Sequence, residues 1–202
     1  MKTLQRQSVL VVVDAQNGFI RETSAPVVPV IADLVSRWQS VGGDVLFTRY
    51  VNYPGSPFER LVHWSGCMES PQIDIVDELL PYAEKATVID KRGYGLFADL
   101  DGAALIAERQ WQDIYVCGIA TESCVLATLL GAFELNLTPW LIEDASISHA
   151  GAHVHDAGLL VARRFIGEGQ IIKVADVPAD LVVPVASQTG AINDCLSTCG
   201  RS

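Results

Sequence analysis

Residues 113–135 read DIYVCGIATESCVLATLLGAFEL and carry the pattern on which the fold depends. The first seven residues, 113–119, are rich in β-branched and other apolar residues, as in a strand buried on both faces. Residues 124–135 are apolar almost all round a helical repeat, which is typical of a buried helix. The segment therefore predicts a strand that leads through a turn at Gly118 directly into a helix.

The same alternation of apolar strands and helical segments extends along the chain. Short apolar runs predict five further strands, at residues 8–13, 44–50, 86–90, 138–144 and 170–174. Helical periodicity occurs between them, at residues 29–41, 74–80, 99–110 and 153–167. Strands that alternate with helices favour right-handed crossovers. We therefore predict an α/β domain with three layers, α-β-α, built on a six-stranded, mostly parallel sheet.

The domain is expected to span residues 1–175. Residues 176–202 form a C-terminal tail that we expect to pack on the domain or on a neighbouring subunit. Residues 51–72 are rich in Pro, Gly and Ser and make the longest irregular stretch. A long loop inside a compact domain often has a function, such as that of a lid.

The composition excludes several classes of protein. The chain has 202 residues, is 50% hydrophobic and carries a formal net charge of −10. It is too apolar for a disordered chain, and its acidic balance argues against a general partner for nucleic acid or an anionic membrane. No stretch approaches the roughly 20 apolar residues of a membrane span, and the first apolar run stops at Asp14, too early for a signal peptide. We expect a cytoplasmic protein.

The cysteines do not form the pattern of a disulfide-stabilised domain. Their number is odd and their spacing irregular, at Cys67, Cys117, Cys124, Cys195 and Cys199. Cys117 is expected in the core of a strand. The last two cysteines are either a redox or metal pair or two incidental thiols.

Three chemically distinct side chains follow predicted strands. Asp14 follows the first, Lys91 ends the third, and Cys124 follows the fourth at the start of a helix. Ligands of parallel sheets bind beyond the carboxyl ends of the strands, so these three side chains can converge at one edge. An acid, an ammonium group and a thiol together suit nucleophilic catalysis. Each residue also has a structural interpretation: a turn or cap for Asp14, a solvated loop for Lys91 and a buried helix position for Cys124.

Three sequence blocks resemble the signature blocks of the isochorismatase-like cysteine hydrolases. They read VVVDAQNGF at 11–19, IDKRGYGLF at 89–97 and VCGIATESCV at 116–125. The resemblance implies a Rossmann-like, isochorismatase-type fold and a catalytic triad of Asp14, Lys91 and Cys124. It also implies a cis peptide bond between Ile119 and Ala120, and an oxyanion hole formed by the backbone amides of Ala120 and Cys124. Members of the family usually assemble as homodimers or homotetramers.

The resemblance also indicates a reaction. The presence of Cys124 favours a metal-independent hydrolase that cleaves a C–N bond of a small amide, carbamoyl or ureido compound through a thioester. The alternative is the enol-ether hydrolysis of true isochorismatases, with Asp14 as the acid. Nicotinamidases of the family carry a metal-binding D-x-H sequence after the second strand, which is missing here, so we expect no metal and no cofactor.

Four residues are candidates for binding the substrate. Asn17, Phe19 and Tyr94 lie in loops near the predicted site, and Arg49 ends the second strand, where it would bind a carboxylate. A structural salt bridge is the alternative for Arg49, and Gln16 is a candidate for orienting Asp14.

Two further function classes remain open. A dinucleotide-binding protein would need a Gly-rich G-x-G-x-x-G turn after the first strand, whereas the chain reads DAQNGF there. The second class is a non-enzymatic interaction protein that has the same fold as the hydrolases.

Overall fold

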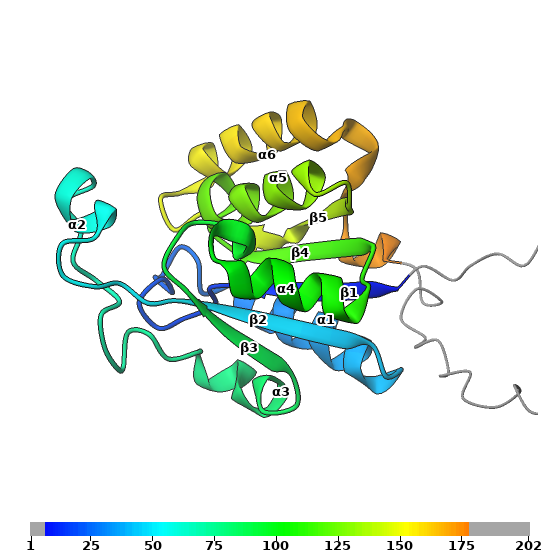
Figure 1. Ribbon diagram of the computed structural model, residues 1–202, viewed down its shortest axis with the longest axis horizontal. Coiled ribbons are helices and arrows are strands. Elements are labelled where there is room, and N and C mark those ends of the chain that lie inside the picture. Colours follow the sequence, from blue (N-terminus) through cyan, green and yellow to red (C-terminus); the bar gives the residue numbers. More distant parts are fainter. Residues whose placement is uncertain (1–6, 178–202) are drawn as a thin grey trace, which may run out of the picture.

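The computed structural model describes residues 7–177, and they form a three-layer α/β domain (Figure 1). The sheet has six strands in the order β3-β2-β1-β4-β5-β6, and every neighbouring pair is parallel. The strands are β1 (Ser8–Val13), β2 (Asp44–Tyr50), β3 (Thr87–Lys91), β4 (Asp113–Ile119), β5 (Thr138–Ile147) and β6 (Ile171–Ile172). The predicted fold class is confirmed.

The helices cover both faces of this sheet (Figure 1). They are α1 (Val27–Ser40), α2 (Pro57–Leu61), α3 (Leu80–Ala83), α4 (Leu100–Arg109), α5 (Leu126–Glu134) and α6 (Ala152–Ile166). One core cluster joins α1 and α3 to one face of the sheet, and a second joins α4, α5 and α6 to the other.

The central strand β1 belongs to both core clusters. Its residues alternate, so that Val9, Val11 and Val13 face α4, α5 and α6, whereas Leu10 and Val12 face α1. All five side chains are fully buried. This double burial explains why the strand reads as an uninterrupted apolar run.

The ends of β1 and β4 approach each other closely at a glycine. Gly118 has φ +117°, a conformation that side chains rarely adopt, and a Cβ atom there would collide with the carbonyl of Val13. The glycine therefore brings the segment after β4 against the residue that precedes Asp14.

Some predicted elements differ from the structure. The predicted helix over 74–80 is replaced by a 3₁₀ turn, Asp77–Leu79, followed by the short α3. The cause is tertiary: Ile75 forms an antiparallel bridge with Gln16, and the N–H of Val76 donates to the carbonyl of Ala15. Residues 75–76 are thus held extended against the loop after β1.

Other differences are smaller. A π-helical turn, Thr121–Val125, precedes α5, where the sequence predicted a helix from Cys124 onward. The long segment 51–72 contains the short helix α2, capped by the Ser56 hydroxyl, which accepts from the Glu59 N–H, and started by Pro57. The expected tail lies almost wholly outside the described residues, as do Cys195 and Cys199.

None of the helices within residues 7–177 is both long enough and apolar enough to cross a membrane.

Candidate active site

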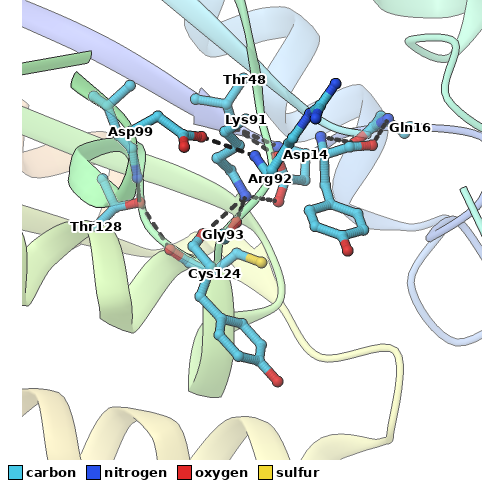
Figure 2. A network of polar contacts seen from close by, with 12 residues as sticks. Asp14, Gln16, Thr48, Lys91, Arg92, Gly93, Asp99, Cys124 and Thr128 are labelled. Atoms are coloured by element: carbon cyan, nitrogen blue, oxygen red, sulfur yellow. Dashed lines mark hydrogen bonds and ion pairs between the residues drawn. The ribbon is translucent and has the colours of Figure 1, made fainter. Parts of the chain in front are cut away.

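The three predicted catalytic side chains gather at the carboxyl edge of the sheet (Figure 2). Asp14 directly follows β1, Lys91 ends β3, and Cys124 lies in the π-helical turn after β4. Asp14 and Lys91 are fully buried, and Cys124 is 7% exposed. The fold therefore brings together side chains that are far apart in the sequence; Asp14 and Lys91 are separated by 77 residues.

The Asp14 carboxylate accepts a hydrogen bond at each of its oxygens. The Thr48 hydroxyl donates to Oδ1 at 2.7 Å, and the Lys91 ammonium donates to Oδ2 at 2.7 Å. The backbone N–H of Asp14 in turn donates to the Thr48 hydroxyl oxygen at 3.2 Å. Two donors on two oxygens match a carboxylate in its ionised, acceptor-only form.

The Lys91 ammonium uses its three N–H donors within the site. Besides Asp14, it donates to the carbonyls of Gly93 at 3.1 Å and Tyr94 at 2.8 Å. Burial by itself lowers the pKa of Lys91, whereas the Asp14 carboxylate raises it, and the net direction is upward. Lys91 is therefore a charged group held in a fixed position, which replaces the solvated-loop alternative.

The Cys124 thiol lies beside Asp14 and Lys91, close enough for both charges to act on it (Figure 2). Burial raises its pKa, the Asp14 carboxylate raises it further, and the Lys91 ammonium opposes them only in part. The ammonium alone would lower the thiol pKa, but the net direction is upward because burial is the largest cause. The resting sulfur therefore keeps its proton beside a carboxylate that can accept it.

The segment between β4 and Cys124 has the geometry that the resemblance implied. The peptide bond between Ile119 and Ala120 is cis. The Ala120 carbonyl accepts from the N–H groups of Ser123 at 3.0 Å and Val125 at 3.2 Å, which fixes the turn that carries the thiol.

A hydroxyl on α5 connects the Lys91 segment to the Cys124 segment (Figure 2). Thr128 accepts from the backbone N–H of Leu96 at 3.2 Å and donates to the carbonyl of Cys124 at 2.8 Å. Gly95 permits this approach, because a Cβ there would lie only 2.9 Å from the Ala127 carbonyl oxygen. Sequence reasoning missed both Thr128 and Thr48, since a lone threonine in an apolar element gives no signal.

Aromatic side chains lie beside the ion pair and include two of the substrate-binding candidates. The Tyr50 ring centroid lies 5.6 Å from Lys91 Nζ and 4.6 Å from the ring of Phe58. Phe58 contacts Tyr94 at 4.7 Å, and Phe19 contacts Tyr50 at 6.4 Å. The structure thus places Phe19 and Tyr94 in one aromatic cluster that reaches Lys91.

The other two candidates have structural partners. Arg49 makes two hydrogen bonds to the Asp90 carboxylate, at 2.7 and 2.9 Å, which is the salt bridge considered as its alternative. The Asn17 side chain donates to the Pro71 carbonyl at 3.1 Å. Gln16 is buried and bonds the backbone of Tyr50 and Ile73, so it does not orient Asp14 through its side chain.

The residues present do not fit a metal of the nicotinamidase kind. Across residues 7–177, no three or more His, Cys, Asp and Glu side chains are grouped so that they could hold a metal ion. His63, the histidine after the second strand, is exposed. No step of the chemistry below passes through a metal.

Comparisons with known proteins agree with this fold. The chain resembles N-carbamoylsarcosine amidase from Thermoplasma acidophilum, with a TM-score of 0.71 and 21% identity over 85% of this chain and 98% of that one. It resembles nicotinamidase from Bacillus subtilis, with a TM-score of 0.73 and 22% identity over 83% and 99% of the two chains. An isochorismatase-like hydrolase from Alkaliphilus metalliredigens gives a TM-score of 0.74 and 18% identity over 84% and 96%.

The family comparison covers the whole sheet. Residues 8–172 match the family model of the isochorismatase domain, from the first residue of β1 to the last residue of β6. The chain belongs to the isochorismatase family of hydrolases.

Proposed function

We propose that this hydrolase cleaves a C–N bond of a small amide, carbamoyl or ureido compound through a thioester on Cys124. One observation carries the proposal: the Cys124 thiol lies beside a carboxylate, Asp14, and an ammonium group, Lys91, whose charges act on it in a buried site. The amidase names among the similar structures support the same reaction class.

The first half-reaction forms the thioester. Asp14 takes the thiol proton while the sulfur attacks the substrate carbonyl carbon. The backbone N–H groups of Ala120 and Cys124 are the proposed donors to the resulting oxyanion, and Lys91 stabilises the negative charge nearby. The C–N bond then breaks, Asp14 returns the proton to the leaving nitrogen, and the acyl group stays on Sγ.

The second half-reaction restores the enzyme. Asp14 takes a proton from water, the hydroxyl oxygen attacks the thioester carbon, and the C–S bond breaks. The proton on Asp14 passes to the sulfur, so the thiol and the carboxylate both return to their starting forms. No metal or cofactor takes part.

The aromatic cluster supports a proposed role for two residues in substrate binding. Phe19 and Tyr94 are the proposed contacts to the apolar part of the substrate. To bind substrate, Asn17 would have to break its hydrogen bond to the Pro71 carbonyl, and Arg49 its salt bridge to Asp90. We therefore propose a smaller role in substrate binding for these two residues.

Enol-ether hydrolysis with Asp14 as the acid is the alternative reaction. It needs a carboxylic acid at the start of the cycle. Both oxygens of Asp14 instead accept hydrogen bonds, from Thr48 and Lys91, so neither is placed as a donor to a substrate, and this geometry favours the role of base.

A substrate panel distinguishes the two reactions. Carboxamides, N-carbamoyl amino acids and ureido acids are assayed for release of ammonia or amine, and isochorismate for release of pyruvate. We expect amine release by the wild-type protein and its loss in Cys124→Ser. Pyruvate release that persists in Cys124→Ser and disappears in Asp14→Asn would establish the alternative reaction instead.

A further inference from the structure

A buried asparagine, Asn52, fixes the chain where it leaves the sheet after β2. Its side chain is almost fully buried. The Oδ1 atom accepts hydrogen bonds from the Tyr50 hydroxyl at 2.9 Å, the Ser56 hydroxyl at 2.6 Å and the Tyr53 N–H at 2.9 Å. One amide oxygen therefore joins the last residue of β2 to the residue that caps α2.

The same asparagine also binds a stretch of chain more than ten residues further on. Its Nδ2 atom donates to the carbonyls of Trp64 at 3.3 Å and Gly66 at 3.0 Å, and its backbone N–H donates to the carbonyl of Cys67 at 2.7 Å. A Cβ atom on Gly66 would lie 2.5 Å from the Trp64 ring, so this ring packs directly on the bonded backbone. Asn52 thus closes residues 52–67 into one loop, called loop 52–67 below.

This loop has little packing of its own to hold its shape. Its helix, α2, lies beyond the end of β2 and away from the other helices (Figure 1). All five residues of α2 are exposed or half-buried. Backbone polar groups outside regular structure need partners from side chains or water. We therefore expect the shape of loop 52–67 to depend on the hydrogen bonds of Asn52.

Loop 52–67 supplies two rings to the aromatic cluster beside Lys91. The rings of Phe58 and Trp64 lie 4.6 and 5.9 Å from the ring of Tyr50, measured between centroids. Trp64 also stacks on Phe19 at 5.6 Å, with 27° between the ring planes. The position of the loop therefore decides how closely this cluster packs.

Tyr50 connects Asn52 to the buried ion pair. The phenol is 1% exposed, its hydroxyl donates to Asn52, and its ring lies 5.6 Å from Lys91 Nζ. Burial raises the pKa of Tyr50, so the hydroxyl keeps its proton and remains a donor. The partners of the Asn52 side chain are strand and loop residues, so it acts on the site through them.

We propose that Asn52 is a positioning residue for substrate binding. By holding Tyr50 and loop 52–67, it keeps the aromatic cluster in the arrangement that binds the apolar part of the substrate. The inference rests on the proposed function, which makes the substrate a small amide. It predicts that affinity for an amide with an aromatic group depends on Asn52, because rings packed on rings add to affinity. Affinity for an amide without such a group should not depend on Asn52.

Binding of two amides to the full-length Cys124→Ala protein, which cannot form the thioester, tests the proposal. Phenylacetamide carries an aromatic ring and acetamide only a methyl group, and ligand-observed NMR titrations give both dissociation constants. We expect phenylacetamide to bind at least about tenfold more tightly. Adding Asn52→Asp should remove most of this difference, because a carboxylate cannot donate to the carbonyls of Trp64 and Gly66. The affinity for acetamide should stay the same.

Gln39→Glu is the matched control, made in the same Cys124→Ala protein. The Gln39 amide also donates to a backbone carbonyl, that of Tyr82 at 2.9 Å, but it lies on α1. This variant should keep the full difference between the two amides. Tyr50→Phe is a milder second variant, since it removes one bond to Asn52 and keeps the ring, and it should lose part of the difference. Circular dichroism shows whether each variant is folded.

Three results would overturn the proposal. They are equal binding of the two amides by the Cys124→Ala protein, an unchanged difference in the folded Asn52 or Tyr50 variant, and equal weakening of both amides, which would indicate a merely structural role. Failure of the proposed function would appear elsewhere, as absence of amine release by the wild-type protein, and these binding measurements need no turnover.

Discussion

Replacement of Cys124 with alanine is expected to lower kcat by on the order of 10³-fold or more on any substrate that the wild-type protein hydrolyses. The reason is that Sγ is the proposed nucleophile, and Asp14 and Lys91 are charged groups that act on it. Removal of Sγ deletes the covalent intermediate while leaving the buried ion pair in place. The measurement is kcat and KM with the best substrate from the panel.

Cys117→Ala is the matched control for loss of a buried thiol. Cys117 lies in β4, is fully buried, and has its pKa raised by burial alone, without a charged neighbour. This variant loses some packing but should keep the wild-type kcat. Wild-type turnover by Cys124→Ala would show that the thiol is not the nucleophile.

The second large effect is expected in the ion pair between Asp14 and Lys91. The two groups meet at 2.7 Å with no exposed surface on either side chain. Breaking a fully buried pair leaves one charge without compensation, which costs about 3–5 kcal/mol in the free energy of unfolding. We expect Asp14→Asn and Lys91→Met each to lose stability of this size and to lose catalysis as well.

The double variant separates the structural effect from the catalytic one. Asp14→Asn combined with Lys91→Met leaves no unpaired charge, so it should be clearly more stable than the sum of the two single losses predicts. It should remain inactive, because the proton acceptor is gone. Urea unfolding gives the stabilities. Losses below about 1 kcal/mol for both single variants would mean that the pair is not desolvated as the structure shows.

The strands, and the meeting of three side chains at one edge of the sheet, were predictable because their signals are local. β1 and β4 are buried on both faces, so their apolar runs are continuous, and the rule for parallel sheets then places Asp14, Lys91 and Cys124 at one edge. Residues 74–80 show the limit of such reasoning. Their helical spacing is real, but backbone bonds to Ala15 and the bridge to Gln16 hold part of the segment extended.

The rest of the site depends on strand register, that is, on which residues pair across neighbouring strands. The local sequence pattern does not reveal these pairs. Val13 pairs with Thr48 across β1 and β2, and this places the Thr48 hydroxyl beside Asp14. Arg49 pairs with Asp90 across β2 and β3, so the two charges meet as cross-strand neighbours. A one-residue change of register would have freed Arg49 for substrate and removed the donor from Asp14.

The central claim is that the acyl group of the substrate is carried by the sulfur of Cys124. Mass spectrometry of the protein, quenched in acid during turnover and then digested, tests this claim most directly. We predict that the peptide containing Cys124 gains the mass of the acyl group, and that the gain disappears once the substrate is used up. An acyl group on another residue, or continued turnover with Cys124 unmodified throughout, would contradict it.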